Sequence, residues 1–176
     1  MAPWSAETPS RYAGARVVPL GALPMPGYPQ VRIATTPRWA LERTLRDFRA
    51  DVVHLASPIN VGLRGLMAAQ RLDLPTVAVY QTNVPSYAAQ YGLPAMEAML
   101  RWRVQLIHET ATLSLVPSRA SWELLHAMGV TTLELWGRGV DADLFHPSRR
   151  CDTWRTEVAP RGGRIVGFVG RLAPEK

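Results

Sequence analysis

The chain has 176 residues, 47% of them hydrophobic, and 20 basic against 14 acidic side chains give it a net charge of +6. This composition excludes a disordered tail and provides enough apolar surface for a core without a disulfide or metal. The only cysteine, Cys151, has no partner in the chain, which favours a reducing compartment. No apolar run reaches the roughly 18 residues of a membrane span, and the first residues do not show a basic region followed by an apolar stretch, so we expect a cytoplasmic protein.

The basic side chains do not form a recognisable binding stripe. Nineteen of the 20 are arginines, Lys176 being the only lysine, and they are spread along the chain, often beside carboxylates. A sequence pI near 10.2 raises nucleic acid as a partner, but such partners require charge gathered on one surface. We therefore expect no nucleic-acid partner.

The N-terminal third combines a proline-rich stretch with one helix. Six prolines within residues 1–30 exclude a helix there and leave room only for short extended pieces near residues 17–20, so we expect an irregular stretch. Residues 37–49 then show helical periodicity, with Leu41, Leu45 and Phe48 on the apolar face.

Apolar runs alternate with helical segments in the rest of the chain. We expect strands at 51–56, 76–80, 112–116, 132–136 and 164–169, and helices at 60–72, 94–110 and 118–129. In the last helix, Ser118 is expected as the N-cap, Trp122, Leu125 and Met128 as the buried stripe, and Gly129 as the stop. Alternation with short connections predicts βαβ units, and hence an α/β fold with a parallel sheet and flanking helices.

A polar cluster follows each apolar run, where ligands bind in open parallel sheets. The clusters are Ser57–Pro58, Gln81–Thr82–Asn83, Ser118–Arg119, Gly137–Arg138–Gly139 and Gly170–Arg171. We expect all five along one edge of a sheet or of two facing sheets. Each also has a structural interpretation: a helix cap for Ser118, simple turns for Ser57–Pro58 and for the glycine-containing cluster at 137–139, where the glycines would allow a tight turn and close backbone approach.

Sequence motifs for metal or cofactor binding are missing. The four histidines show no HxxxH or HExxH spacing, and neither GxGxxG nor GxxxxGK[ST] occurs. Asp141 and Asp143 form a DxD pair, but they follow a glycine-rich turn, and we expect no metal or cofactor there. The mixed basic and aromatic residues 100–103 fit either a core-facing helix with solvated arginines or a helix lying on a membrane surface.

These motifs, in their order along the chain, resemble glycosyltransferase family four. The resemblance rests on DVVHL at 51–55, VYQT at 79–82, VPS at 116–118, GRGVD at 137–141 and VGRLAPEK at 169–176, and covers nearly all of residues 16–176. Within this family, the sequence resembles actinobacterial mannosyltransferases that use GDP-mannose on lipid acceptors. The resemblance implies a GT-B fold of two Rossmann-like domains and a retaining transfer of a hexose, mannose in these relatives, from a nucleotide sugar to a lipid or glycan acceptor.

The same resemblance implies roles for individual residues, although it identifies no catalytic residue. Arg171 and Lys176 match the basic pair that binds the donor diphosphate, where two cations offset the charge of the departing group. Gln81 stands where many members carry histidine, and its amide can hydrogen-bond a sugar hydroxyl but cannot act as acid or base. The residues expected to line the acceptor side of the cleft are Gln81, Thr82, Asn83, Ser118, Gly137, Arg138, Gly139 and Asp141.

The resemblance also implies a domain organisation. Residues 1–160 correspond to an N-terminal, acceptor-side domain without its first strand and Gly-rich loop, and residues 161–176 to the start of a nucleotide-sugar domain. We therefore expect the isolated chain to be inactive and its apolar strand at 164–169 to be unpaired. The implied enzyme acts in glycolipid synthesis, in the cytoplasm or peripherally at the inner face of the membrane. A non-enzymatic Rossmann-like binding module is the alternative.

Overall fold

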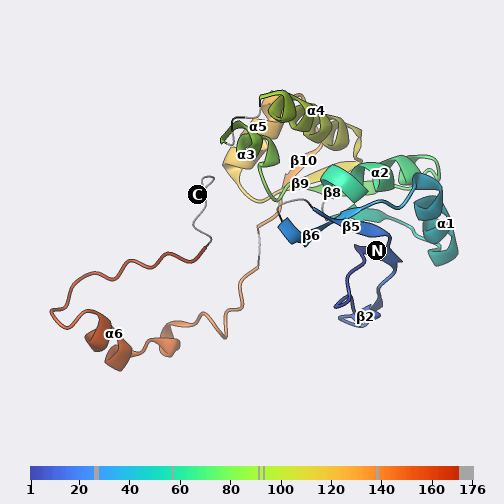
Figure 1. Ribbon diagram of the computed structural model, residues 1–176. Coiled ribbons are helices and arrows are strands. Elements are labelled where there is room, and N and C mark those ends of the chain that lie inside the picture. Colours follow the sequence, from blue (N-terminus) through green and yellow to red (C-terminus); the bar gives the residue numbers. More distant parts are fainter. Residues whose placement is uncertain (26–27, 57, 91, 93, 138, 171–176) are drawn as a thin grey trace. The chain divides into compact units, whose positions relative to one another are not determined.

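The computed structural model describes residues 1–25, 28–56, 58–90, 92, 94–137 and 139–170. They belong to two compact units, Met1–Trp136 and Gly137–Lys176, which are described separately (Figure 1). The expected domain boundary near residue 160 stays a prediction.

The first unit is built on a four-stranded parallel sheet of order β10-β9-β8-β7. The strands are β7 (Val53–Leu55), β8 (Thr76–Val79), β9 (Leu113–Val116) and β10 (Leu133–Leu135). Val53 pairs with Thr76, Val77 with Leu113, and Ser114 with Leu133. This sheet confirms the predicted α/β class with a parallel sheet. The strands form here because their successive residues are apolar, so that both faces of each strand can be buried.

Helices connect these strands and were largely predicted. They are α1 (Arg38–Phe48), a π-helix (Pro58–Gly62) that leads into α2 (Leu63–Gln70), α3 (Val84–Gln90), α4 (Pro94–Thr110) and α5 (Arg119–Ala127). The bounds of α4 are those expected, and the helix at 118–129 is confirmed as α5. Gly129 ends that helix with φ +96°, a conformation that favours glycine. Helix α3 was not predicted.

The interior of the first unit consists of two groups of buried side chains. The first core cluster joins helices α1, α2 and α4 to strands β7 and β8, and includes Leu41, Leu55, Leu66, Ala78 and Ile107. The second core cluster joins α4 and α5 to β9 and β10. It comprises Tyr80, Val104, Val116, Leu125, Val130 and Leu133. Of the predicted α5 stripe, Leu125 is fully buried, whereas Trp122 and Met128 are half-buried.

Two residues of helix α1 differ in burial from the expected apolar face. Leu41 and Leu45 are buried as predicted, but Phe48 is 77% exposed and Glu42 is buried instead. The Glu42 carboxylate forms ion pairs with Arg38, Arg71 and Arg46, with nitrogen–oxygen distances of 3.1, 3.3 and 3.8 Å. Burial of a carboxylate requires such partners, and periodicity alone does not reveal an arginine brought in from the C-terminal end of α2.

The prediction of an irregular N-terminal stretch was wrong in part: the described residues among 1–30 form no helix and the extended piece expected near residues 17–20 is β4, but further strands also form there. Strands β5 (Ala22–Met25) and β6 (Tyr28–Ala34) pair antiparallel. Shorter pairings precede this ribbon: β1 (Ala2–Pro3) runs parallel to β4 (Pro19–Leu20), and β2 (Arg11–Tyr12) antiparallel to β3 (Ala15–Arg16). Prolines are compatible with strands at a sheet edge, and a two-stranded ribbon consists of edges only.

The second unit contains a short 3-10 helix, Pro147–Arg149, and α6, Asp152–Val158. Neither was predicted. The segment 164–169, expected as a strand, has no regular secondary structure in this structure. Its expected exposure without a pairing partner is confirmed, since Val166 is 93% exposed. A strand requires a hydrogen-bonded neighbour, and no described segment pairs with these residues.

Candidate functional site

The carboxyl ends of β8 and β9 bring four predicted site residues to one edge of the sheet. Gln81, Thr82 and Asn83 follow β8 after the buried Tyr80, and Ser118 follows β9. Gln81, Thr82, Asn83 and Ser118 are all exposed. Because β8 and β9 are adjacent and parallel, their ends meet at the edge where ligands approach such a sheet. Ser57, in the expected cluster after β7, lies outside the described residues.

Ser118 acts as a helix cap. Its Oγ accepts a hydrogen bond from the backbone N–H of Ser121 at 3.2 Å and donates one to the Ser121 hydroxyl at 3.1 Å. The structural interpretation of this residue is therefore confirmed. Any contact it makes with a ligand would have to be added to this cap.

Asn83 begins helix α3, which the sequence analysis missed. Its Oδ1 accepts from the Ser86 backbone N–H at 3.4 Å, and its carbonyl oxygen accepts from the Ser86 hydroxyl at 2.8 Å. An asparagine followed by Pro85 within the first turn is a helix-start signal, so this element could have been found. The turn at 81–83 thus leads directly from a buried strand into a helix at the sheet edge.

A cavity of about 130 Å³ lies beside this turn, between α3, α4 and α5. We call it the α3–α4 cavity. Its polar lining consists of Tyr80, Asn83, Ser86, Glu97 and Arg101, and its apolar lining includes Val104, Leu124 and Met128. Arg101 Nη2 lies 3.0 Å from Glu97 Oε1. The sequence analysis missed Glu97 and Arg101, although a Glu–Arg pair four residues apart on a helix is a visible signal. Donors and acceptors on apolar walls suit a hydroxylated ligand.

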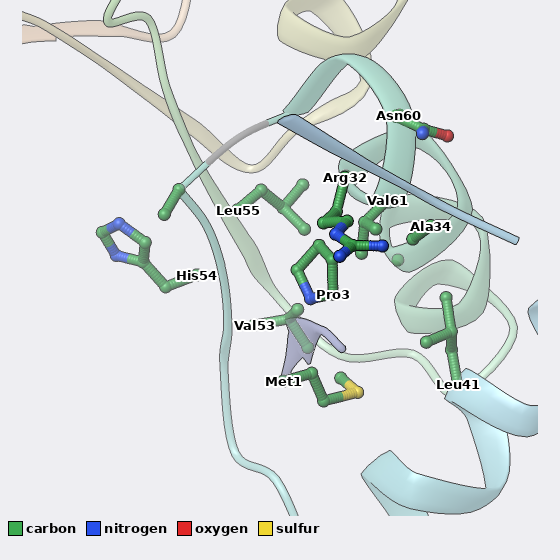
Figure 2. Close-up of a pocket in the computed structure, with 13 residues that line it drawn as sticks. Met1, Pro3, Arg32, Ala34, Leu41, Val53, His54, Leu55, Asn60 and Val61 are labelled. Atoms are coloured by element: carbon green, nitrogen blue, oxygen red, sulfur yellow. The ribbon is translucent and has the colours of Figure 1, made fainter. Parts of the chain in front are cut away.

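A larger, mostly apolar cavity of about 250 Å³ lies at β7, where β1, β6 and the π-helix meet (Figure 2). Leu41, Val53 and Leu55 contribute apolar surface, and Arg32 and Asn60 are polar members of the lining. Figure 2 shows Arg32 among the side chains that line this cavity, together with Pro3, Ala34 and Val61. None of these residues was predicted as part of a site, but π-helices often occur at functional positions.

A buried polar pair joins α4 to β9 and contacts Tyr80, which lines the α3–α4 cavity. His108 on α4 and Ser114 on β9 are both fully buried, and His108 Nδ1 lies 2.8 Å from Ser114 Oγ. Burial lowers the pKa of His108 to about 4, so the ring is neutral at pH 7. Burial also raises the pKa of Tyr80, an effect that Arg101 partly offsets.

Three of the predicted site residues that the structure describes belong to the second unit. Gly137 and Gly139 have no positive φ, and no atom lies within 4 Å of the point that a Cβ would occupy at either of them, so no contact within the described chain requires glycine there. The expected tight turn stays a prediction, because Arg138 between them lies outside the described residues. The Asp141 carboxylate accepts from the backbone N–H of Asp143 at 3.1 Å and of Leu144 at 2.8 Å. This local turn gives the Asp141 side chain a structural role and involves only the backbone of Asp143. The acceptor-side role of all three stays a prediction.

The remaining predicted site residues, Arg138, Arg171 and Lys176, lie outside the described residues. The expected binding of a donor diphosphate by Arg171 and Lys176 therefore stays a prediction. Among the helices of the described chain, none combines the length and apolar character needed to cross a membrane.

Comparison with known proteins agrees with the fold and the ordered motifs. A GDP-mannose-dependent alpha-mannosyltransferase of Mycobacterium tuberculosis (strain CDC 1551 / Oshkosh) is 50% identical over 141 residues, which are 80% of this chain and 37% of the relative. One of Corynebacterium glutamicum is 35% identical over 172 residues, 97% of this chain and 41% of the relative. Sulfoquinovosyl transferase SQD2 of Arabidopsis thaliana is 32% identical over 176 residues, 96% of this chain and 34% of the relative. No solved structure matches the chain at a significant level.

The chain thus spans well under half the length of these relatives. The family model described as Glycosyltransferase Family 4 matches residues 2–144, which include the whole parallel sheet and the polar turn at its edge. The chain belongs to glycosyltransferase family 4.

Proposed function

We propose that this chain supplies the acceptor side of a retaining mannosyltransferase that moves mannose from GDP-mannose to a lipid or glycan acceptor. The observation that carries the proposal is the 50% identity over 141 residues to a GDP-mannose-dependent alpha-mannosyltransferase. An aligned stretch of that length in a chain of 176 residues has to include the central sheet and its edge residues. Hydroxyls of the acceptor would then form hydrogen bonds with the Gln81 amide, the Thr82 hydroxyl and the polar side chains that line the α3–α4 cavity.

Donor binding forms the second part of the proposal. Arg171 and Lys176 would bind the diphosphate of GDP-mannose and stabilise the charge that develops on GDP as it departs. Gly137, Arg138, Gly139 and Asp141 would line the cleft. We expect no metal requirement, since the Asp141 carboxylate already accepts hydrogen bonds from two backbone amides. Activity should therefore be unchanged by EDTA, and loss of activity restored by Mg²⁺ or Mn²⁺ would contradict this.

The central experiment inserts residues 1–176 between the N-terminal and C-terminal parts of the M. tuberculosis relative that lie outside the aligned region, so that the expected first strand and Gly-rich loop are supplied as well as the second domain. We expect this chimera to transfer labelled mannose to the acceptor of the relative. Gln81→Ala should raise the KM for the acceptor, and Arg171→Ala the KM for GDP-mannose, whereas Arg43→Ala on the exposed face of α1 should change neither. A folded chimera that transfers nothing, beside an active relative, would overturn the proposal. Residues 1–176 alone should transfer nothing.

We also propose peripheral contact with the inner face of the membrane through α4. Met96, Met99 and Trp102 are exposed on this helix, Trp102 by 59%, and a spacing of three residues places them on one side of it. Trp102→Ser should reduce flotation of the chain with anionic vesicles, and Trp39→Ser, which removes an exposed tryptophan from α1, should not. Equal flotation of both variants and the parent would count against α4 as the contact.

A further inference from the structure

His108 and Ser114 form a polar pair in a place where apolar side chains would fit. Both are fully buried, next to Ile107 and Val116, which are also fully buried. Ser114 Oγ lies 2.8 Å from His108 Nδ1 and is also within hydrogen-bond distance, 3.3 Å, of the His108 carbonyl oxygen. Burying polar groups gives little net stability even when they are paired, so the pair calls for another explanation.

One ring nitrogen of His108 is left without a hydrogen-bond partner. If the Ser114 hydroxyl donates to the carbonyl oxygen, Nδ1–H donates to Ser114 and Nε2 is a bare acceptor; if it donates to Nδ1, Nε2 carries the proton. In both tautomers Nε2 is buried and makes no hydrogen bond within the described chain. A buried nitrogen in this state costs free energy, whereas a phenylalanine would not incur this cost.

The His108 ring is packed against Tyr80. The ring centroids are 5.6 Å apart and the ring planes meet at 76°, an edge-to-face arrangement that restricts how both rings are oriented. Tyr80 is itself buried, and its backbone N–H donates to the Leu115 carbonyl at 2.9 Å. It is the last residue before Gln81, and its side chain lines the α3–α4 cavity together with Asn83 and Arg101.

We propose that His108 is a positioning residue: held by Ser114, it fixes the Tyr80 ring and thereby both the wall of the α3–α4 cavity and the start of the turn at Gln81–Asn83. The part of the proposal that concerns acceptor binding rests on the proposed function. The part that concerns the turn does not, because it follows from contacts within the first unit.

Amide hydrogen exchange in the whole chain, resolved by residue, tests the structural part. His108→Asn keeps a polar group near the position of Nδ1 for Ser114 and removes the ring that meets Tyr80. The control is Leu66→Ala, which destabilises the first core cluster away from Tyr80. At matched global stability we expect the amides of Val84 and Ser86, which donate hydrogen bonds to Thr82 and Asn83, to exchange about tenfold faster in His108→Asn than in the control.

Equal exchange in the two variants would overturn the proposal. Should His108→Asn fail to fold, Ser114→Ala, which keeps the ring and removes its anchor, gives the same readout against the same control. A faster exchange confined to Val84 and Ser86 supports the proposal, and no change there overturns it.

Kinetics of the chimera provide the second readout. We expect His108→Asn to raise the acceptor KM about tenfold while the KM for GDP-mannose and kcat stay unchanged. A merely structural role would lower kcat through a smaller folded fraction and leave both KM values alone, which would overturn the proposal. A parent chimera without activity would defeat the proposed function, whereas the exchange measurement would still decide the role of His108.

Discussion

The two units of the chain differ in how their helices are held. In the first unit, α1, α2, α4 and α5 place side chains in two core clusters together with the strands. In the second unit, none of the described residues, 137 and 139–170, is buried. Its two short helices rely on local caps: the His146 ring accepts from the Ser148 backbone N–H, and Cys151 Sγ accepts from that of Trp154. Local hydrogen bonds are enough to form a helical turn, but burial requires a partner element.

Matched leucine truncations should separate the units most clearly. Leu125→Ala empties a fully buried position of the second core cluster and should lower the free energy of unfolding by about 2 to 5 kcal/mol. Leu144→Ala in the second unit removes a side chain that is 58% exposed and should have almost no effect. Urea unfolding of both variants is the measurement. Similar losses would show that Leu144 is buried in solution.

A pH dependence from His108 should be the next largest effect. Because the folded-state pKa of about 4 lies below the ordinary value of 6.5, the folded state binds fewer protons, so stability is full above pH 6.5 and falls as the pH drops towards 4. The loss should approach about 3 kcal/mol. His108→Asn should flatten this part of the profile, whereas His146→Asn, at an exposed position of the second unit, should leave it unchanged. A profile that is the same in all three proteins would contradict the assignment.

Removal of an ion pair should also lower the free energy of unfolding more in the first unit than in the second. Glu42→Gln removes a buried charge from three arginines and should cost about 1 kcal/mol in the free energy of unfolding. Asp152→Asn removes a pair with Arg150 that is shorter, at 2.7 Å, but exposed on both sides, and should change thermal unfolding little. A larger loss for Asp152→Asn than for Glu42→Gln would mean that distance matters here more than burial.

Helix caps should give the smallest difference. Ser118→Ala removes the cap of α5, a helix that carries Leu125 into the core, and should lower the free energy of unfolding by up to about 1 kcal/mol. Cys151→Ala removes the cap of α6, whose residues are not buried, and should leave the main unfolding transition in place. Circular dichroism during urea unfolding can compare the two variants. An equal shift of that transition would indicate that α6 belongs to the same cooperative unit.

Only some residues of the candidate site could be predicted from local sequence patterns. Gln81, Thr82, Asn83 and Ser118 could be placed at the sheet edge because strand alternation and the parallel-sheet rule need only local information. Tyr80, Glu97 and Arg101 could not be assigned to a common cavity. They come from the end of β8 and from α4, and their approach depends on how these elements pack.

The sequence by itself determined the α/β class, the bounds of α4, the cap at Ser118 and the stop at Gly129, because periodicity and capping act within a few residues. Only the tertiary structure decided that Phe48 faces solvent while Glu42 is buried, that β5 and β6 pair despite their prolines, and that 164–169 forms no strand. Each of these depends on a partner from elsewhere in the chain: an arginine, a second ribbon strand or a neighbouring sheet edge. Burial and strand pairing each require two segments of the chain, whereas a local sequence pattern describes only one of them.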